Sequence, residues 1–208
     1  MSSLLKAALP VAGIGGMGAG GYYLLSDSST IRDKLKEELK GSPRRILDSK
    51  TRAEWVEWKL VYKDSSSKIS EVSSEEDLPK WCVDTLSHKF DQSKYDKAKE
   101  WCVINTSTLR GEAILKGVNL ISETGNDVAS KFQEAWDKLN KDKGKPEAIS
   151  DATVVGDSIT QKTEGGPKLQ TWCTSRYSWA MYKLEAITDL SKVMKWCSEE
   201  AGTASPSK

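Results

Sequence analysis

A tryptophan precedes each of the four cysteines of this chain, at 81–82, 101–102, 172–173 and 196–197. Around the first Trp-Cys pair, apolar residues recur with the spacing of one face of an amphipathic helix. They are Leu78, Trp81, Cys82 and Leu86. The third pair belongs to a longer stripe of this kind: Leu169, Trp172, Cys173, Tyr177, Ala180, Leu184 and Ile187. The spacing therefore predicts that the cysteines lie on the buried faces of helices.

The order of segments around these pairs occurs twice, at an offset of roughly 80 to 95 residues. In each copy, a helix containing Trp55 or Trp136 comes first, a polar linker follows, and two helices with a Trp-Cys pair end the copy. We therefore predict a mainly α-helical fold, with an N-terminal transmembrane helix followed by two diverged three-helix repeats joined by polar linkers. The core is expected to contain six tryptophans: Trp55, Trp81, Trp101, Trp136, Trp172 and Trp196.

The cysteines of each copy lie about equally far from a turn-like centre. An antiparallel helical hairpin would bring Cys82 opposite Cys102, and Cys173 opposite Cys197, so a disulfide in each hairpin is the first interpretation. Buried free thiols packed beside tryptophan are the second. Zinc and a nucleophilic cysteine have little support, because the chain has no C-x-x-C motif and its single histidine is His88. We predict no catalytic residue, no metal site and no cofactor.

The N-terminal segment 1–25 has the features of a membrane anchor. Residues 7–25 carry no charged side chain, and Tyr22 and Tyr23 lie near the end of this stretch. An uncharged stretch of this length with aromatic residues at one edge meets the criteria for a membrane-spanning helix. We therefore predict that residues 7–25 contact membrane lipid. A cleaved signal peptide and a buried or disordered leader are the alternatives.

The basic residues after this stretch bear on membrane orientation. Six lysines and arginines lie within 26–45, whereas Lys6 and the α-amino group precede the uncharged stretch. The positive-inside rule thus favours a cytoplasmic C-terminal part. The rule weakens when a long folded domain follows and when acids alternate with the cations, as in RDKLKEELK. We predict a single-pass protein of the cell membrane whose soluble part is extracellular.

The rest of the chain divides into helical segments and polar linkers. Helix start signals of the capping-box type occur at Thr30 and at Thr51, and polar composition predicts a linker at 64–77 and a loop at 143–168. The expected organisation is a membrane anchor at 1–25, a juxtamembrane helix and connector at 26–50, a first helical module at 51–105, a connector at 106–127, a second helical module at 128–201 and a disordered tail at 202–208.

Composition narrows the classes of function. Charged residues make up 29% of the chain, yet the formal net charge is +1 and both signs are mixed along the sequence. This balance argues against a nucleic-acid partner, which would require a basic face. No acid–base pair or nucleophile constellation indicates an enzyme or a small-molecule substrate. Trp179, which falls outside the apolar stripe of its helix, is the candidate for an exposed contact residue.

Four motifs occur together with the glycine-rich N-terminal anchor: KLKEEL at 34–39, ILDS at 46–49, YKD at 62–64 and WCVINT at 101–106. In this combination the chain resembles, from residue 1 to about 200, the large paralogous family of uncharacterised membrane-anchored proteins of haemotropic mycoplasmas. The family has a proline after WCV. Here Ile104, Asn105 and Thr106 stand in its place. The rigid turn that a proline would impose after WCV is therefore in doubt for this chain. The resemblance implies a surface-displayed antigen or host-contact protein. It implies no catalytic residue in this chain.

The expected function is that of a membrane-anchored, surface-exposed interaction or antigen-type protein without catalytic activity. Its partner would be a protein on a host surface or a sister chain. The first alternative is a cytoplasm-facing membrane scaffold, and the second is an enzyme of unknown class.

Overall fold

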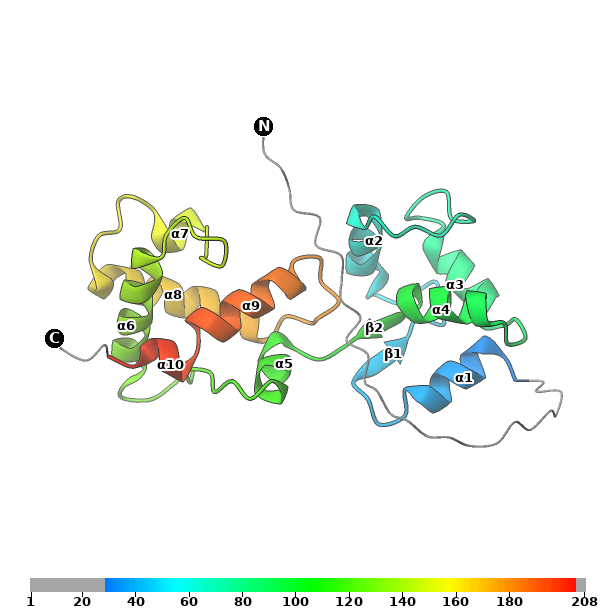
Figure 1. Ribbon diagram of the computed structural model, residues 1–208, viewed down its shortest axis with the longest axis horizontal. Helices are drawn as coiled ribbons and strands as arrows, with labels where there is room; N and C mark the ends of the chain where they lie inside the picture. The colour runs from blue at the N-terminus through cyan, green and yellow to red at the C-terminus, as the bar shows by residue number, and fades with distance from the viewer. Residues whose placement is uncertain (1–28, 205–208) are drawn as a thin grey trace.

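The computed structural model describes residues 29–204, which form ten helices and two short strands. Figure 1 shows two groups of helices side by side along the long axis of the molecule. Each group has its own hydrophobic core. The mainly helical fold class predicted from the sequence is therefore confirmed. The predicted anchor at 1–25 lies outside the described residues, and within 29–204 no helix is long and apolar enough to cross a bilayer.

The first unit, residues 29–106, contains four helices and both strands. Its elements are α1 (Ile31–Glu38), β1 (Arg44–Ile46), α2 (Trp55–Asp64), α3 (Leu78–Leu86), α4 (Gln92–Trp101) and β2 (Val103–Asn105). β1 pairs antiparallel with β2, so that Arg45 lies opposite Ile104. The largest fully buried side chains here are Ile31, Leu35, Leu47, Tyr62, Ile69, Leu78, Leu86 and Ile104.

The second unit, residues 107–204, contains the other six helices. They are α5 (Leu109–Leu115), α6 (Val128–Lys141), α7 (Ala152–Val155), α8 (Lys162–Tyr177), α9 (Ala186–Trp196) and α10 (Glu199–Gly202). Its largest fully buried side chains are Leu109, Ile121, Phe132 and Trp136.

One of the two predicted helix start signals forms. The Thr30 hydroxyl accepts the N–H of Asp33 at 3.2 Å, and the Asp33 carboxylate accepts the N–H of Thr30 at 3.0 Å, which completes a capping box. The same prediction at Thr51 is wrong, because α2 begins after Glu54 without a side-chain capping bond. Glu54 instead accepts a hydrogen bond from Arg45 at 2.5 Å, which ties α2 to β1.

The predicted juxtamembrane helix and the predicted connector at 106–127 both contribute to a core. α1, in the predicted juxtamembrane segment 26–50, buries Ile31 in the first unit. α5, in the predicted connector 106–127, buries Leu109 and Ala113 in the second unit. Two apolar residues one turn apart are too few to show a helical period, so the periodicity analysis missed α5.

The C-terminal helix also departs from expectation. A disordered tail was expected from residue 202, yet Gly202 is buried at the end of α10. α10 is held on α6 by an ion pair between Glu199 and Lys131 at 2.8 Å and by the Lys138 ammonium, which donates to the Thr203 carbonyl at 2.7 Å. Residues 205–208 lie outside the described part of the chain.

The predicted linker at 64–77 contributes to the core of the first unit. Ile69 and Val72 are buried, and the N–H of Ile69 donates to the Tyr62 hydroxyl at 3.1 Å. These two apolar residues, separated by polar ones, anchor a segment that composition alone marks as solvated.

The predicted loop at 143–168 is wrong over much of its length, because it contains α7 and the first turns of α8. The glycines of α8 explain the error. A Cβ built on Gly165 would lie 2.0 Å from Cε2 of Trp136. Glycine is therefore needed at this position for the close approach of α6 and α8, whereas its presence in the sequence suggested a loop.

The longer predicted apolar stripe ends early. α8 stops at Tyr177, and the last two members of the stripe, Leu184 and Ile187, are exposed. The chain leaves the helix axis because Ala180 forms an antiparallel bridge with Thr108, the residue before α5. The prediction that Leu184 and Ile187 are buried is therefore wrong.

Matching backbone hydrogen bonds connect corresponding helices in the two units. In the first unit the N–H of Ile31 donates to the His88 carbonyl at 3.0 Å, and in the second the N–H of Leu109 donates to the Trp179 carbonyl at 2.8 Å. The sequences at these helix starts are STIR and STLR, and in both the threonine side chain caps the helix. α1 and α5 therefore correspond, and the predicted three-helix repeat left them out.

A second matching pair of bonds follows each hairpin. The N–H of Leu47 donates to the Cys102 carbonyl at 2.8 Å, and the N–H of Ile121 donates to the Cys197 carbonyl at 2.8 Å. The first of these bonds lies beside the β1–β2 pair, and the second lies beside an isolated antiparallel bridge at Ser198. Each unit is thus closed by a strand-like contact immediately after its second Trp-Cys pair.

Candidate functional site

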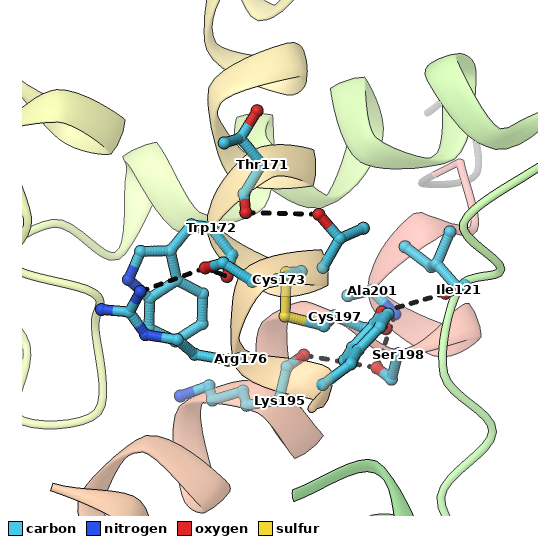
Figure 2. Close-up of a disulfide and its surroundings, with 12 residues drawn as sticks. Ile121, Thr171, Trp172, Cys173, Arg176, Lys195, Cys197, Ser198 and Ala201 are labelled. Carbon is cyan, nitrogen blue, oxygen red and sulfur yellow. Dashed lines mark hydrogen bonds between the residues drawn. A yellow bond between two sulfur atoms is a disulfide. The ribbon is translucent and has the colours of Figure 1, made fainter. Parts of the chain in front are cut away.

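All four cysteines of the chain lie within the described residues, and they form two disulfide bonds. The sulfur atoms of Cys82 and Cys102 are 2.07 Å apart, and those of Cys173 and Cys197 are 1.94 Å apart. Figure 2 shows the second bond between α8 and the end of α9. The disulfide interpretation of the cysteine pattern is therefore confirmed, and all four side chains are fully buried.

Local sequence explains how the first hairpin forms. α3 ends at Leu86, and the chain reverses before α4, whose N-cap Asp91 accepts the N–H of Lys94 at 2.9 Å. This turn places the Cα atoms of the first cysteine pair 5.4 Å apart, a separation that a disulfide can span.

Five of the six tryptophans expected in the core are buried, and the sixth, Trp81, is partly buried. The indole N–H groups of two of them bond to the segment between α6 and α8. Trp136 donates to the Val154 carbonyl at 2.7 Å, and Trp196 donates to the Glu147 carbonyl at 2.7 Å. A buried indole N–H usually has such a partner, and these two bonds fix the path of the segment between α6 and α8.

Trp101 is the centre of an aromatic cluster in the first unit. The Tyr62 ring meets it edge-on at a centroid distance of 4.7 Å, and the Trp58 ring is tilted against it at 5.9 Å. The Trp58 indole also donates to the Trp101 carbonyl at 2.8 Å. α2 is therefore held against the first disulfide hairpin by its aromatic face.

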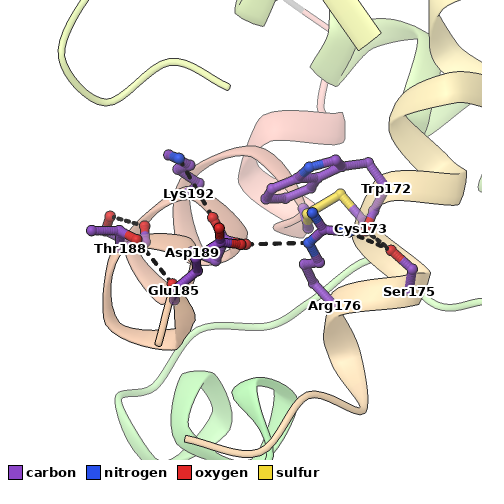
Figure 3. A network of polar contacts seen from close by, with 10 residues as sticks. Trp172, Cys173, Ser175, Arg176, Glu185, Thr188, Asp189 and Lys192 are labelled. Carbon is purple, nitrogen blue, oxygen red and sulfur yellow. Dashed lines mark hydrogen bonds and ion pairs between the residues drawn. A yellow bond between two sulfur atoms is a disulfide. The ribbon is translucent and has the colours of Figure 1, made fainter. Parts of the chain in front are cut away.

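Trp179, the candidate contact residue, is partly buried against the core of the second unit. The guanidinium carbon of Arg176 lies 4.2 Å from the ring centroid, and the Lys183 ammonium lies 4.7 Å from it. Figure 3 shows that Arg176 extends between Trp172 and Asp189, with its Nε 3.2 Å from the carboxylate. Trp179 is thus one member of a cation–aromatic stack within the protein.

Burial affects the chemistry of one tyrosine beside the second disulfide. The Tyr177 hydroxyl donates to the carbonyls of Ile121 at 2.9 Å and Cys197 at 3.3 Å. Burial raises the pKa of Tyr177 above its ordinary value, against the opposing charge of Arg110. The phenol therefore stays protonated and acts as a hydrogen-bond donor that joins α8 to the end of the hairpin.

The two units contact each other through residues 178–185, the loop inside the second hairpin. The cysteines of this hairpin are 24 residues apart, against 20 in the first. In the longer loop, Tyr182 packs against the core of the first unit, and the Lys183 ammonium lies 4.0 Å from the Glu57 carboxylate. The longer hairpin therefore reaches the neighbouring unit.

The connection between the units is short and hydrogen-bonded. The Asn105 amide donates to the Glu112 carboxylate at 2.8 Å, and its side-chain oxygen accepts the N–H of Ser107 at 2.9 Å. Asn105 belongs to the WCVINT segment at 101–106. Its side chain fixes the start of α5 relative to β2.

Each unit carries an open cavity on its surface. The first has a volume of about 450 Å³ and is lined by Trp81, His88 and charged residues of both signs. These charges pair with one another: Lys80 lies 2.7 Å from Asp84, which lowers the pKa of Asp84, and Lys97 lies 3.5 Å from Glu71. The second cavity, of about 510 Å³, is likewise edged by an ion pair. Within the described residues, no three His, Cys, Asp or Glu side chains cluster to hold a metal ion.

Exposed apolar side chains lie on both sides of the contact between the units. On α2, Val56 and Leu60 are exposed on either side of Glu57, and Leu184 follows Lys183 on the other side of that ion pair. Together with Ile187, the exposed residues Val56, Leu60 and Leu184 define the junction surface. The sequence analysis missed it, because it depends on how two segments distant in the sequence meet.

Comparison with known protein families, curated proteins and solved structures gives no match for this chain.

Proposed function

We propose that this chain is a membrane-anchored interaction protein without catalytic activity, whose helical units face outward from the cell membrane. The observation that supports this best is the pairing of all four cysteines in disulfides. Disulfides form and persist in oxidising compartments and are rare in the cytosol. The uncharged stretch at 7–25 would supply the anchor.

The geometry of the described residues suits a binding role. Two small units, each cross-linked internally and fixed to the other at Asn105 and Tyr182, form a stiff body that can present a surface. The junction surface is the candidate contact for a host protein or a sister chain, because exposed apolar groups often mark interaction sites. This role agrees with the resemblance to membrane-anchored proteins of haemotropic mycoplasmas.

Protease treatment of intact cells tests this proposal. We expect the protein to be cut while a cytosolic marker stays intact, because the exposed segments would face the medium. Complete protection until the cells are lysed would contradict the outward orientation.

One observation favours a second candidate, a membrane scaffold that faces the cytoplasm. The six basic residues within 26–45 follow the uncharged stretch directly, as the positive-inside rule requires of a cytoplasmic flank. A reducing cytosol would keep the thiols free. Alkylation during lysis of the cells in denaturant would then modify all four cysteines, whereas the outward orientation predicts that none is modified.

A further inference from the structure

An exposed aromatic side chain lies where the described chain begins. The Ser29 carbonyl accepts the N–H of Phe90 at 3.1 Å, and Thr30 forms an antiparallel bridge with Lys89. Phe90 is 39% exposed, although the Tyr95 ring packs against it at a centroid distance of 5.4 Å. The start of the first unit is therefore fixed beside a ring that is accessible from outside.

One basic side chain contacts this ring, and two more lie close to it in the chain. The ammonium of Lys34 lies 5.8 Å from the Phe90 ring centroid. Lys89 is the preceding residue, and Lys94, in the first turn of α4, has its ammonium 3.3 Å from Nδ1 of His88. The nearby acids, Asp33 and Asp91, each accept a backbone N–H at a helix N-terminus. Their negative charges are therefore partly offset by the positive ends of α1 and α4.

The second unit has a corresponding edge, and through this edge it contacts the first unit, which precedes it in the chain. There the N–H of Met181 donates to the Ser107 carbonyl at 2.9 Å, just as Phe90 donates to Ser29 in the first unit. Tyr182, the next residue, packs against the core of the first unit. In the first unit, the corresponding edge, at Ser29 and Phe90, is where the described chain begins.

Covalent geometry limits how far this edge can lie from the proposed anchor. Leu25 ends the uncharged stretch and is four residues before Ser29. An extended chain covers about 3.6 Å per residue at most, so the two residues lie within about 14 Å of each other in any conformation. The headgroup layer on each side of a bilayer is about 5 to 8 Å thick. With residues 7–25 in the membrane, the edge at Phe90 therefore lies close to the headgroups.

We infer that the Phe90 edge, defined as Ser29, Lys34, Lys89, Phe90 and Lys94, is a membrane-contact surface that places the Phe90 ring among the headgroups of anionic phospholipids. An aromatic ring is stable at the membrane interface, and lysines near an anionic surface are attracted to it. Figure 1 shows that α1 begins at the end of the molecule away from the second unit. The second unit and the junction surface would then project from the membrane. This inference rests on the proposed anchoring.

Photo-crosslinking of the full-length chain in lipid nanodiscs tests the inference. The variant replaces Phe90 with the photoreactive p-benzoylphenylalanine, and the discs contain phosphatidylglycerol with phosphatidylcholine. We expect irradiation to give a lipid adduct at position 90, detected by mass spectrometry. The matched control places the same group at Leu115, which is 73% exposed on the second unit, and should give no lipid adduct.

Charge reversal tests the electrostatic part of the inference. Lys89→Glu and Lys94→Glu should each lower the adduct yield more than about tenfold in anionic discs, because one positive charge near the surface contributes roughly fivefold and each reversal changes the charge by two units. In phosphatidylcholine discs the same substitutions should change little.

The possible contrary outcomes separate the two proposals. A chain that resists alkaline extraction but gives no lipid adduct at position 90, or crosslinks there to a second protein copy, overturns the membrane-contact surface and leaves the anchor intact. A chain that alkaline carbonate releases from the membrane overturns the proposed anchoring and this inference with it.

Discussion

Within each Trp-Cys pair, the two side chains stabilise different parts of the structure. Cys197 links α9 to α8 covalently, whereas its neighbour Trp196 binds the segment before α7 through the Glu147 carbonyl. Apolar spacing predicts that both residues are buried, but it does not give the partner of the indole N–H. That partner lies in a segment without a regular pattern, so its position depends on the tertiary fold.

Gly165 is a residue at which one added methyl group should be destabilising. Gly165→Ala places a Cβ against the Trp136 ring, and such overpacking typically costs about 1–3 kcal/mol of the free energy of unfolding. Urea denaturation measures it. Gly111→Ala is the matched control, because its Cβ would meet only the Thr108 hydroxyl oxygen, at an ordinary contact distance of 3.4 Å. The control should gain about 0.5–1 kcal/mol from the higher helix propensity of alanine. Equal effects at both positions would contradict the close contact of α6 and α8.

Glu54 should make stability depend on pH in the acid range. A hydrogen bond from its own backbone N–H lowers the pKa of Glu54, burial opposes this, and the Arg45 guanidinium lowers the pKa further. This stabilisation is present above the unfolded-state pKa of about 4.3 and is lost as pH falls through the lower folded-state pKa. Glu54→Gln should therefore lose less stability on acidification than the wild type does. Parallel pH curves of the unfolding midpoint would refute this.

At the level of elements, the sequence predicts the longer helices well and the short ones poorly. α3 and the central part of α8 follow from their apolar stripes. α7 spans four residues and each strand spans three, which is too short for any period to show. The disulfide partners could be proposed from the symmetry of the hairpins, although the closure of each hairpin by Leu47 or Ile121 could not.

The two disulfides should contribute similarly to stability. Their cysteines are 20 and 24 residues apart, and loops of this size give about 3 kcal/mol each by the chain-entropy estimate. The variants Cys82→Ala/Cys102→Ala and Cys173→Ala/Cys197→Ala should each lose about that amount in denaturant titrations. A reductant should lower the midpoint of the wild type and leave a variant without cysteines unchanged. A wild type insensitive to complete reduction would show that the cross-links do not stabilise the fold.

At the level of the whole molecule, the main departure from expectation is the absence of an independent connector between the two units. The structure assigns 106–127 largely to the second unit and joins the units through Asn105 and Tyr182. Sequence periodicity could not show this contact, because Tyr182 lies far along the chain from the residues of the first unit that it touches.

Tyr182 should couple the unfolding of the two units. Tyr182→Ala removes a partly buried ring from their contact, which should cost about 1–3 kcal/mol and broaden or split the thermal transition seen by calorimetry. Glu57→Ala is the matched control at the same contact. Its exposed ion pair with Lys183 should contribute less than about 0.5 kcal/mol. If both variants unfold like the wild type, the units do not stabilise each other.

The most direct test of the central claim is peptide mapping without reduction, on protein from cells that are lysed in denaturant with a reagent that blocks free thiols. The Trp-Cys pairs are expected to hold each hairpin together from within. Peptides containing Cys82 and Cys102 should therefore be joined to each other, those containing Cys173 and Cys197 should likewise be joined, and no cysteine should carry the blocking group. Blocking groups on all four cysteines, or links between the two units, would contradict the account.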